Sequence, residues 1–203
     1  LAMRKGVRVT MGGADALPAF YQLLDVTSRR RNFVIHSLDY YEEVWRCLAD
    51  RGMARLLLAT HENELLAAAL ILVMGECAYY MYGASNGKQR NLKPNDLLQW
   101  EALRWAQSVG CTSYDLWGIP DVVGEQVERG QDPEAADEAL WGVFQFKRGF
   151  GGEVVRYVGA YDYVYAPARY WLWMQLLPWR RRAAALVRGG VELAGCLGRP
   201  SFG

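Results

Sequence analysis

Apolar residues recur at helical spacing in several stretches of the chain, and shorter apolar or alternating runs lie between these stretches. Helical spacing predicts helices over 15–30, 38–52, 96–109, 137–149 and 167–188. Runs bounded by turn residues predict strands over 54–61, 64–74, 76–85, 113–119 and 151–165. The polar segment 121–136 contains glycine, proline and acids, and this composition predicts a loop. In 96–109, the spacing places Leu98, Ala102, Trp105 and Val109 on one buried face.

The predicted elements follow the order helix, helix, three antiparallel strands, helix, strand, helix, strand, helix. This order predicts an α+β (mixed α/β) fold in which helices flank a central, mostly antiparallel sheet. We expect one domain over 1–165, followed by an aromatic and basic helix and tail over 166–203.

The composition is that of a globular protein without a strong overall charge. The chain has 203 residues, of which 52% are hydrophobic, and its formal net charge is +1. This balance excludes a disordered chain and a broad basic field that attracts nucleic acid. The four cysteines form no C-x-x-C pair and the two histidines stand apart, so we expect a reduced, cytoplasmic protein without a metal site. The longest apolar run, near 65–74, is shorter than the ~20 residues of a membrane span.

Three stretches together carry a family resemblance: YYMYGASNGKQRNLKPNDLLQW (79–100), YDLWGIPD (114–121) and FQFKRGFGGEVVRYVG (144–159). With the opening MRKGVRV, they resemble the Fem (FemABX) family, whose members transfer amino acids from aminoacyl-tRNA to the stem peptide of peptidoglycan precursors. The resemblance implies a GNAT acyltransferase-like fold, and this chain is similar to the second of the family's two such domains. It is similar to the compact subgroup without a coiled-coil hairpin. We therefore expect 166–203 to pack on a missing first domain.

Lys147 is the first candidate for chemistry. Helical register places it with Leu140, Val143 and Phe144, at the end of an apolar stripe and not on the polar face. A lysine in a last helical turn also has an ordinary explanation, because a cation there is favourable and its stem can cover apolar surface. The resemblance implies a catalytic role, in which the ammonium stabilises negative charge during transfer. It also implies that Phe146 contacts the aminoacyl group, although core packing explains Phe146 equally well.

By this resemblance, the loop 83–96 corresponds to the loop with which acyl-CoA-dependent acyltransferases hold the diphosphate of coenzyme A. It has no glycine after Gly87, and Pro94 removes one N–H donor, so coenzyme A is disfavoured. Its Arg90 and, more weakly, Lys88 are candidates to bind phosphates or carboxylates of a cell-wall precursor, or else are solvated loop cations. Asn95 is most simply the N-cap of the next helix, from which it can also aim N–H groups at a ligand.

Asp115 and Asp121 flank the end of the predicted strand 113–119 and are possible proton acceptors, or else structural or solvated acids. The segment 170–182 is aromatic and then basic, which suits either peripheral contact with the inner face of a membrane or packing on the missing domain.

The resulting expectation is an aminoacyltransferase of the Fem type. Its co-substrate is aminoacyl-tRNA, its acceptor is a nucleotide- or lipid-linked muramyl peptide, and it has no other cofactor. Two alternatives stay open: an acyl-CoA-dependent GNAT N-acetyltransferase and a non-catalytic precursor-binding module. We expect this chain alone to be inactive or nearly so.

Overall fold

The computed structural model describes residues 1–133 and 138–179. The chain divides into two compact units, Leu1–Arg156 and Tyr157–Gly203. The first unit contains the sheet and its helices. In the second unit, residues 167–179 form a helix, and the expected continuation of that helix to 188 lies outside the described residues. Its packing on another domain stays a prediction.

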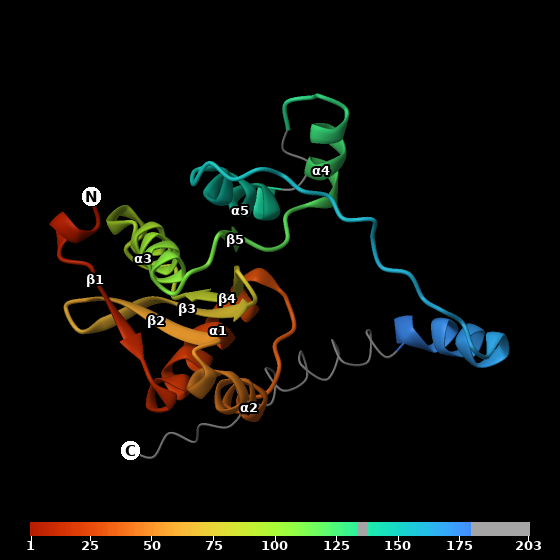
Figure 1. Cartoon of the computed structure of the whole chain (residues 1–203), viewed down its shortest axis with the longest axis horizontal. Helices are drawn as coiled ribbons and strands as arrows, with labels where there is room; N and C mark the ends of the chain where they lie inside the picture. The colour runs from red at the N-terminus through yellow and green to blue at the C-terminus, as the bar shows by residue number, and fades with distance from the viewer. Residues whose placement is uncertain (134–137, 180–203) are drawn as a thin grey trace, which may run out of the picture. The chain divides into compact units, whose positions relative to one another are not determined.

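A five-stranded sheet of order β1-β2-β3-β4-β5 forms the centre of the first unit (Figure 1). Its strands are β1 (Arg8–Gly12), β2 (Ala54–His61), β3 (Glu64–Met74), β4 (Cys77–Ser85) and β5 (Ser113–Asp115). The first four strands are antiparallel to their neighbours, whereas β5 runs parallel to β4. Parallel neighbours need a crossover connection, which α3 (Pro94–Ser108) provides. The predicted mixed α/β fold with a mostly antiparallel sheet is confirmed.

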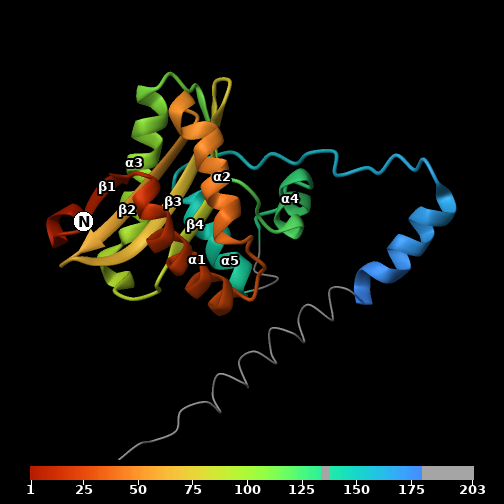
Figure 2. The ribbon, with the colours of Figure 1, turned by 90° about the horizontal axis from the view of Figure 1, so that it is seen from below.

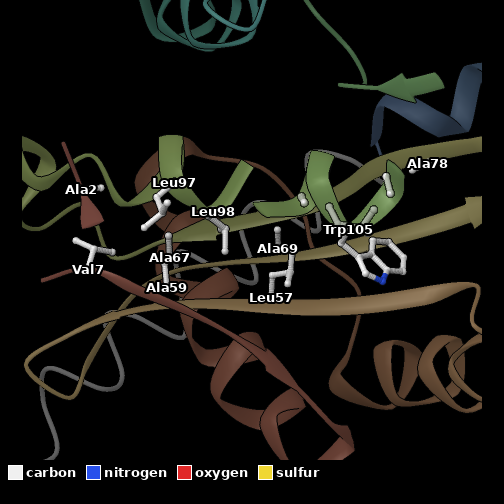
Figure 3. Packing of buried hydrophobic residues seen from close by; sticks show 13 residues of the cluster. Ala2, Val7, Leu57, Ala59, Ala67, Ala69, Ala78, Leu97, Leu98 and Trp105 are labelled. Carbon is white, nitrogen blue, oxygen red and sulfur yellow. The ribbon is translucent and has the colours of Figure 1, made fainter. Parts of the chain in front are cut away.

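Helices cover both faces of this sheet. Figure 1 shows α3 on one face, and Figure 2, seen from below, shows α1 (Leu17–Arg31) and α2 (Leu38–Leu48) in front of the other. Side chains of a strand alternate between the two faces, so successive residues of β2 join different cores. Leu56 packs with Phe20 and Tyr41 of α1 and α2, whereas Leu57 packs with Trp105 of α3 (Figure 3).

Burial of β3 on both faces of the sheet explains why its sequence is a continuous apolar run. Ala67 and Ala69 lie in the core under α3, and Ala68 and Leu70 lie in the core under α1 and α2, all fully buried (Figure 3 shows the α3 side). A strand covered on both faces has no polar face to alternate with. The turn before it is a two-residue hairpin in which Glu62 and Asn63 have φ angles of 49° and 65°, as a primed turn requires.

Several sequence expectations are wrong in detail. Residues 8–12 form the edge strand β1, whose mostly exposed side chains lack an apolar signal, and no strand was predicted there. The segment 121–136 was predicted as a loop, but its first part forms helix α4 (Asp121–Glu128), where Val123 packs inward. The strand predicted over 113–119 ends at Asp115, because the chain turns at Trp117, whose φ is 65°.

The largest difference concerns 151–165, which alternates like a strand but pairs with no described strand. Its Val158, Tyr161 and Tyr163 are more than four-fifths exposed. Val109 is also exposed, since α3 ends before it, and Ala106 takes its place in the core. In the described part of the chain, no helix has the length and apolar character to cross a membrane.

Candidate active site

Helix α5 (Glu138–Arg148) carries Lys147 on its buried face. Phe144, one turn earlier, is 4% exposed, Lys147 is 8% exposed, and Arg148 next to it is exposed. The apolar stripe read from the sequence is therefore real at this end of the helix. Gly149 continues the helical hydrogen-bond pattern by donating to the Gln145 carbonyl, and the chain reverses at Gly151, which has a φ of 78°.

The ammonium group of Lys147 binds two backbone carbonyls of the turn after β5. Nζ donates to the Trp117 oxygen at 3.2 Å and also to the Gly118 oxygen. Burial lowers the pKa of Lys147 to about 8, and the nearby Asp115 carboxylate raises it in part. An ammonium has three N–H donors, so one donor is left beyond these two carbonyls.

Asp115 holds the same turn from the other side. Its Oδ1 accepts a hydrogen bond from the Trp117 N–H at 2.6 Å. Trp117 has a φ of 65°, a conformation that costs a non-glycine residue about 1–2 kcal/mol. The Asp115 carboxylate and the Lys147 ammonium thus bind the N–H and the carbonyl of the same strained residue, Trp117. Whether Asp115 also accepts a proton during a reaction stays a prediction.

Asp121 lies apart from this arrangement of hydrogen bonds. It is the first residue of α4 and is exposed, and its charge acts on the guanidinium of Arg156. A carboxylate at a helix N-terminus is favourable in itself. Its role as a proton acceptor stays a prediction.

Phe146 is half-buried and packs against Phe150, with the ring centroids 5.4 Å apart in an edge-to-face arrangement. It neighbours Lys147 in the chain. Among the described residues no group of three or more metal-ligating side chains lies close enough to bind a metal ion.

The connection from β4 to α3 carries the predicted cations in different settings. Lys88 forms an ion pair with Glu64 at 2.9 Å. Arg90 is exposed in a short 3-10 turn, Arg90–Leu92, and no hydrogen bond or ion pair of its side chain is formed within the described residues. The pKa of Arg30 is lowered, first by burial and then by the positive charges of Arg31 and Arg90.

The prediction that Asn95 caps α3 is wrong. Lys93 occupies the N-cap position with a φ of 60°, and Pro94 is the first helical residue. Proline is favoured there, because its missing N–H has no partner in a helix's first turn and its φ already suits a helix. Asn95 is the half-buried second residue of the helix.

The parallel pairing of β4 and β5 sets the distance between the two groups of residues. Tyr79 of β4 lies opposite Asp115 of β5 and also packs against Trp117, with ring centroids 6.3 Å apart. The cations follow Ser85, which is six residues further along β4, or about 20 Å at the rise of a strand. The structure therefore joins Lys147 to Asp115 and separates both from Arg90.

Arg30 is a site residue whose position beside β4 the sequence did not predict. Its Nη2 donates to Ser85 Oγ at 3.0 Å, and its guanidinium covers Gly87 so closely that a Cβ there would lie 2.4 Å from Nη1. With Arg90 it places two cations at the end of β4. The signal in the sequence was the run 29–31, which ends α1, but a basic helix end is common and does not reveal which cation turns toward the sheet.

A tyrosine pair was also missed. The hydroxyls of Tyr40 and Tyr82 lie 3.1 Å apart, and His36 stacks on Tyr40 with centroids 4.0 Å apart. Burial, and then the Tyr40 hydroxyl, raise the pKa of Tyr82. These rings come from α2, the segment before it and β4, so only the tertiary structure brings them together.

Comparisons with known proteins agree on one family. The sequence matches the FemAB family over residues 1–64 and 50–177. Similar relatives include the lipid II:glycine glycyltransferase of Staphylococcus epidermidis, which is 24% identical over 81% of this chain and 51% of its own. The enzyme of the same name from Staphylococcus aureus is 22% identical over 88% of this chain and 55% of its own. The chain thus spans about half the length of the curated relatives it matches.

Solved structures show the fold. FemX superimposes with a TM-score of 0.63 at 21% identity, covering 74% of this chain and 51% of FemX. An aminoglycoside acetyltransferase from a soil metagenomic sample, solved with sisomicin, superimposes with a TM-score of 0.54 at 14% identity, covering 81% of this chain and 99% of its own. The fold is therefore the one shared by FemX and these acetyltransferases.

Proposed function

This chain belongs to the FemAB family, and we propose that the protein transfers an amino acid from aminoacyl-tRNA to the stem peptide of a peptidoglycan precursor. Family membership and the two glycyltransferase relatives support this proposal. Because the chain spans about half of those relatives, the activity is proposed for the protein as a whole, with this chain as the domain that carries Lys147.

The proposed reaction exchanges one acyl bond for another. A nitrogen of the acceptor's amine attacks the ester carbonyl carbon of the aminoacyl-tRNA and forms a C–N bond. The C–O bond to the ribose then breaks, the amine loses a proton and the ribose hydroxyl gains one. Negative charge develops first on the carbonyl oxygen and then on the leaving ribose oxygen, so a fixed cation at either position lowers the barrier.

The observation that carries the proposal is the setting of Lys147. A buried ammonium is costly unless it is hydrogen bonded, and here two carbonyls fix its position. Its remaining N–H can donate to a developing oxyanion without reorganisation, which is the requirement for electrostatic catalysis. A lysine that served only as a favourable helix end would lie exposed, as Arg148 does.

The arginines at the end of β4 supply the second half of the proposal. Arg30 and Arg90 place two guanidinium groups where a diphosphate or carboxylate of the precursor can be bound. The Ser85 end of β4, which Arg30 binds, lies about 20 Å along the strand from Tyr79, which packs against Trp117, and an extended peptide of about six residues spans that distance. A muramyl peptide with a diphosphate at one end and a stem peptide at the other has suitable dimensions.

Coenzyme A fits the same loop poorly. The first turn of α3 begins with Pro94, which has no N–H, and carries the carboxylate of Asp96. Both features oppose a phosphate at that helix N-terminus. We therefore propose that the donor is not acyl-CoA, although the fold is shared with acetyltransferases.

An assay of the protein with charged tRNAs tests the proposal. The donors are a panel of aminoacyl-tRNAs with different amino acids, and the acceptors are the nucleotide-linked and lipid-linked muramyl peptides. We expect transfer of the labelled amino acid to at least one acceptor. Calorimetry with acetyl-CoA is the matched control: micromolar affinity together with no transfer from any aminoacyl-tRNA would identify an N-acetyltransferase instead. Tight binding of precursor without any transfer would identify a binding module.

A further inference from the structure

An exposed aromatic ring lies beside the lysine site. Trp117 is 50% exposed, although its own carbonyl oxygen is 3.2 Å from Lys147 Nζ. The ring is therefore carried by the same turn whose carbonyls bind the ammonium of α5, so a ligand that contacts Lys147 lies close to this turn.

The backbone conformation of Trp117 in this turn is energetically unfavourable. A φ of 65° suits glycine, and the next residue, Gly118, does not take such an angle. The strained conformation persists because Asp115 binds the Trp117 N–H while Lys147 binds its carbonyl. Strained backbone conformations of this kind are frequent at functional sites, where several contacts with surrounding residues hold them in place. A large ring at the strained position, and not glycine, indicates that the ring has a use.

The ring is anchored but not covered. It stands at 82° to Tyr79 in an edge-to-face contact, while half of its surface stays open. An indole held on a rigid turn is suited to stacking, because it loses little conformational entropy on binding. Exposed aromatic rings in proteins that bind single-stranded nucleic acid stack on bases with about 1–3 kcal/mol per base.

We propose that Trp117 stacks on the nucleobase of the nucleotide whose ribose carries the aminoacyl ester. The inference rests on the proposed function, in which the ammonium of Lys147 faces the ester and its ribose oxygen. The base is attached to that same ribose, so it is the planar group held nearest to the ammonium. Stacking adds donor affinity and orients the ester without reading the rest of the tRNA.

Two substitutions separate the ring from the turn. Trp117→Gly removes the ring and keeps the turn, because glycine adopts a positive φ without strain. Trp117→Phe keeps a stacking ring of smaller area. Trp100→Ala is the matched control, since Trp100 is 54% exposed but lies on α3, which contributes no group to the Lys147 site.

Two minimal donors separate the base from the ester: aminoacyl-adenosine, and the same aminoacyl ester on a ribose without a base. With aminoacyl-adenosine we expect Trp117→Gly to raise KM by about 5- to 150-fold, Trp117→Phe to restore most of the loss and Trp100→Ala to leave KM unchanged. With the abasic donor, we expect wild type and Trp117→Gly to have equal KM values. Calorimetry with a 3′-amide analogue of aminoacyl-adenosine should show the same order in Kd.

Three results would overturn the inference. Equal losses with both donors would make Trp117 a support for the turn. A loss confined to the KM of the muramyl peptide would mean that the ring contacts the acceptor. No loss in any constant would leave the ring without a role in binding. Transfer by the wild type in the same assay keeps these results separate from a failure of the proposed function, which would appear as no transfer from any aminoacyl-tRNA.

Discussion

The Lys147 ammonium lies 3.2 Å from the carbonyl oxygen of Trp117, a residue 30 positions earlier in the chain. This contact ties the end of α5 to the turn after β5. Asp115 completes the link by accepting the Trp117 N–H and by acting on the Lys147 charge. A change that removes the Lys147 or Asp115 side chain, or that moves the Trp117 backbone, is therefore expected to affect the other two residues.

Removing the charge of Lys147 tests its catalytic role. Lys147→Met keeps most of the volume but cannot donate to an oxyanion, so we expect kcat to fall about 10²- to 10³-fold with little change in the Kd of the precursor. Single-turnover transfer and calorimetry measure the two quantities. Arg148→Met is the matched control, since Arg148 is exposed on the same helix turn and should keep full activity. An unchanged rate for Lys147→Met would mean that this lysine only supports the turn.

The pH dependence should follow the state of the same ammonium. Its pKa is about 8, and only the protonated form carries the stabilising charge, so the transfer rate should fall as pH rises above about 8. Asp115→Asn removes the negative charge that raises the Lys147 pKa while keeping an oxygen for the Trp117 N–H. The falling limb of the rate profile should therefore move to lower pH in this variant. If the falling limb does not move in Asp115→Asn, the fall in rate at high pH is not caused by deprotonation of Lys147.

The free energy of unfolding should rise with pH over the range in which the transfer rate falls. The Lys147 pKa is about 8 in the folded chain and 10.5 in its reference state, so the unfolded chain binds more protons between these values. The free energy of unfolding contributed by this group should rise with pH over that range, by on the order of 2 kcal/mol. Urea titrations at pH 7.5 and 9.5 measure it as the difference between wild type and Lys147→Met. A difference that is independent of pH would contradict the lowered pKa.

Gly83 should not tolerate a side chain. A Cβ at this position would lie 1.9 Å from the hydroxyl oxygen of Tyr80, whose pKa burial raises to about 12. Overpacking of this kind typically costs about 1–3 kcal/mol, so Gly83→Ala should lower the midpoint of thermal unfolding. Gly142→Ala is the control: among the described residues, no atom outside its own helix turn and its chain neighbours lies within 4 Å of its Cβ position, and alanine favours the α5 helix. Equal midpoints for the two variants would show that Tyr80 moves aside freely.

Arg90 should matter for the acceptor and not for the donor. Arg90→Ala removes a guanidinium that has no protein partner among the described residues, so we expect a higher KM for the muramyl peptide and an unchanged KM for aminoacyl-tRNA. Lys88→Ala should have a smaller effect, because Lys88 is already paired with Glu64. Arg104→Ala, an exposed arginine paired with Glu101, controls for loss of surface charge. A rise in the donor KM alone would place the tRNA at this end of β4.

Features that depend on neighbouring residues and on periodic spacing could be predicted from the amino-acid sequence of this protein. The apolar spacing predicted helix α1 and the continuous apolar run predicted strand β3. Both predictions work because buried positions recur with the periodicity of the element, or fill a strand that is covered on both faces. The motif around Lys147 indicated the family, and the position of that lysine in the apolar stripe indicated its burial. These properties depend on residues close together in the chain.

Contacts between residues that are far apart in the sequence could be found only in the tertiary structure. The alternation in 151–165 predicted a strand, but none is formed there in the described structure, because alternation along the chain does not by itself supply the partner strand that pairing needs. The pairing of Lys147 with the Trp117 carbonyl, and of Arg30 with Ser85, depends on how α5, α1 and β4 are placed by the cores that bury them. Side-chain period records which face is buried, but it does not record what lies opposite that face.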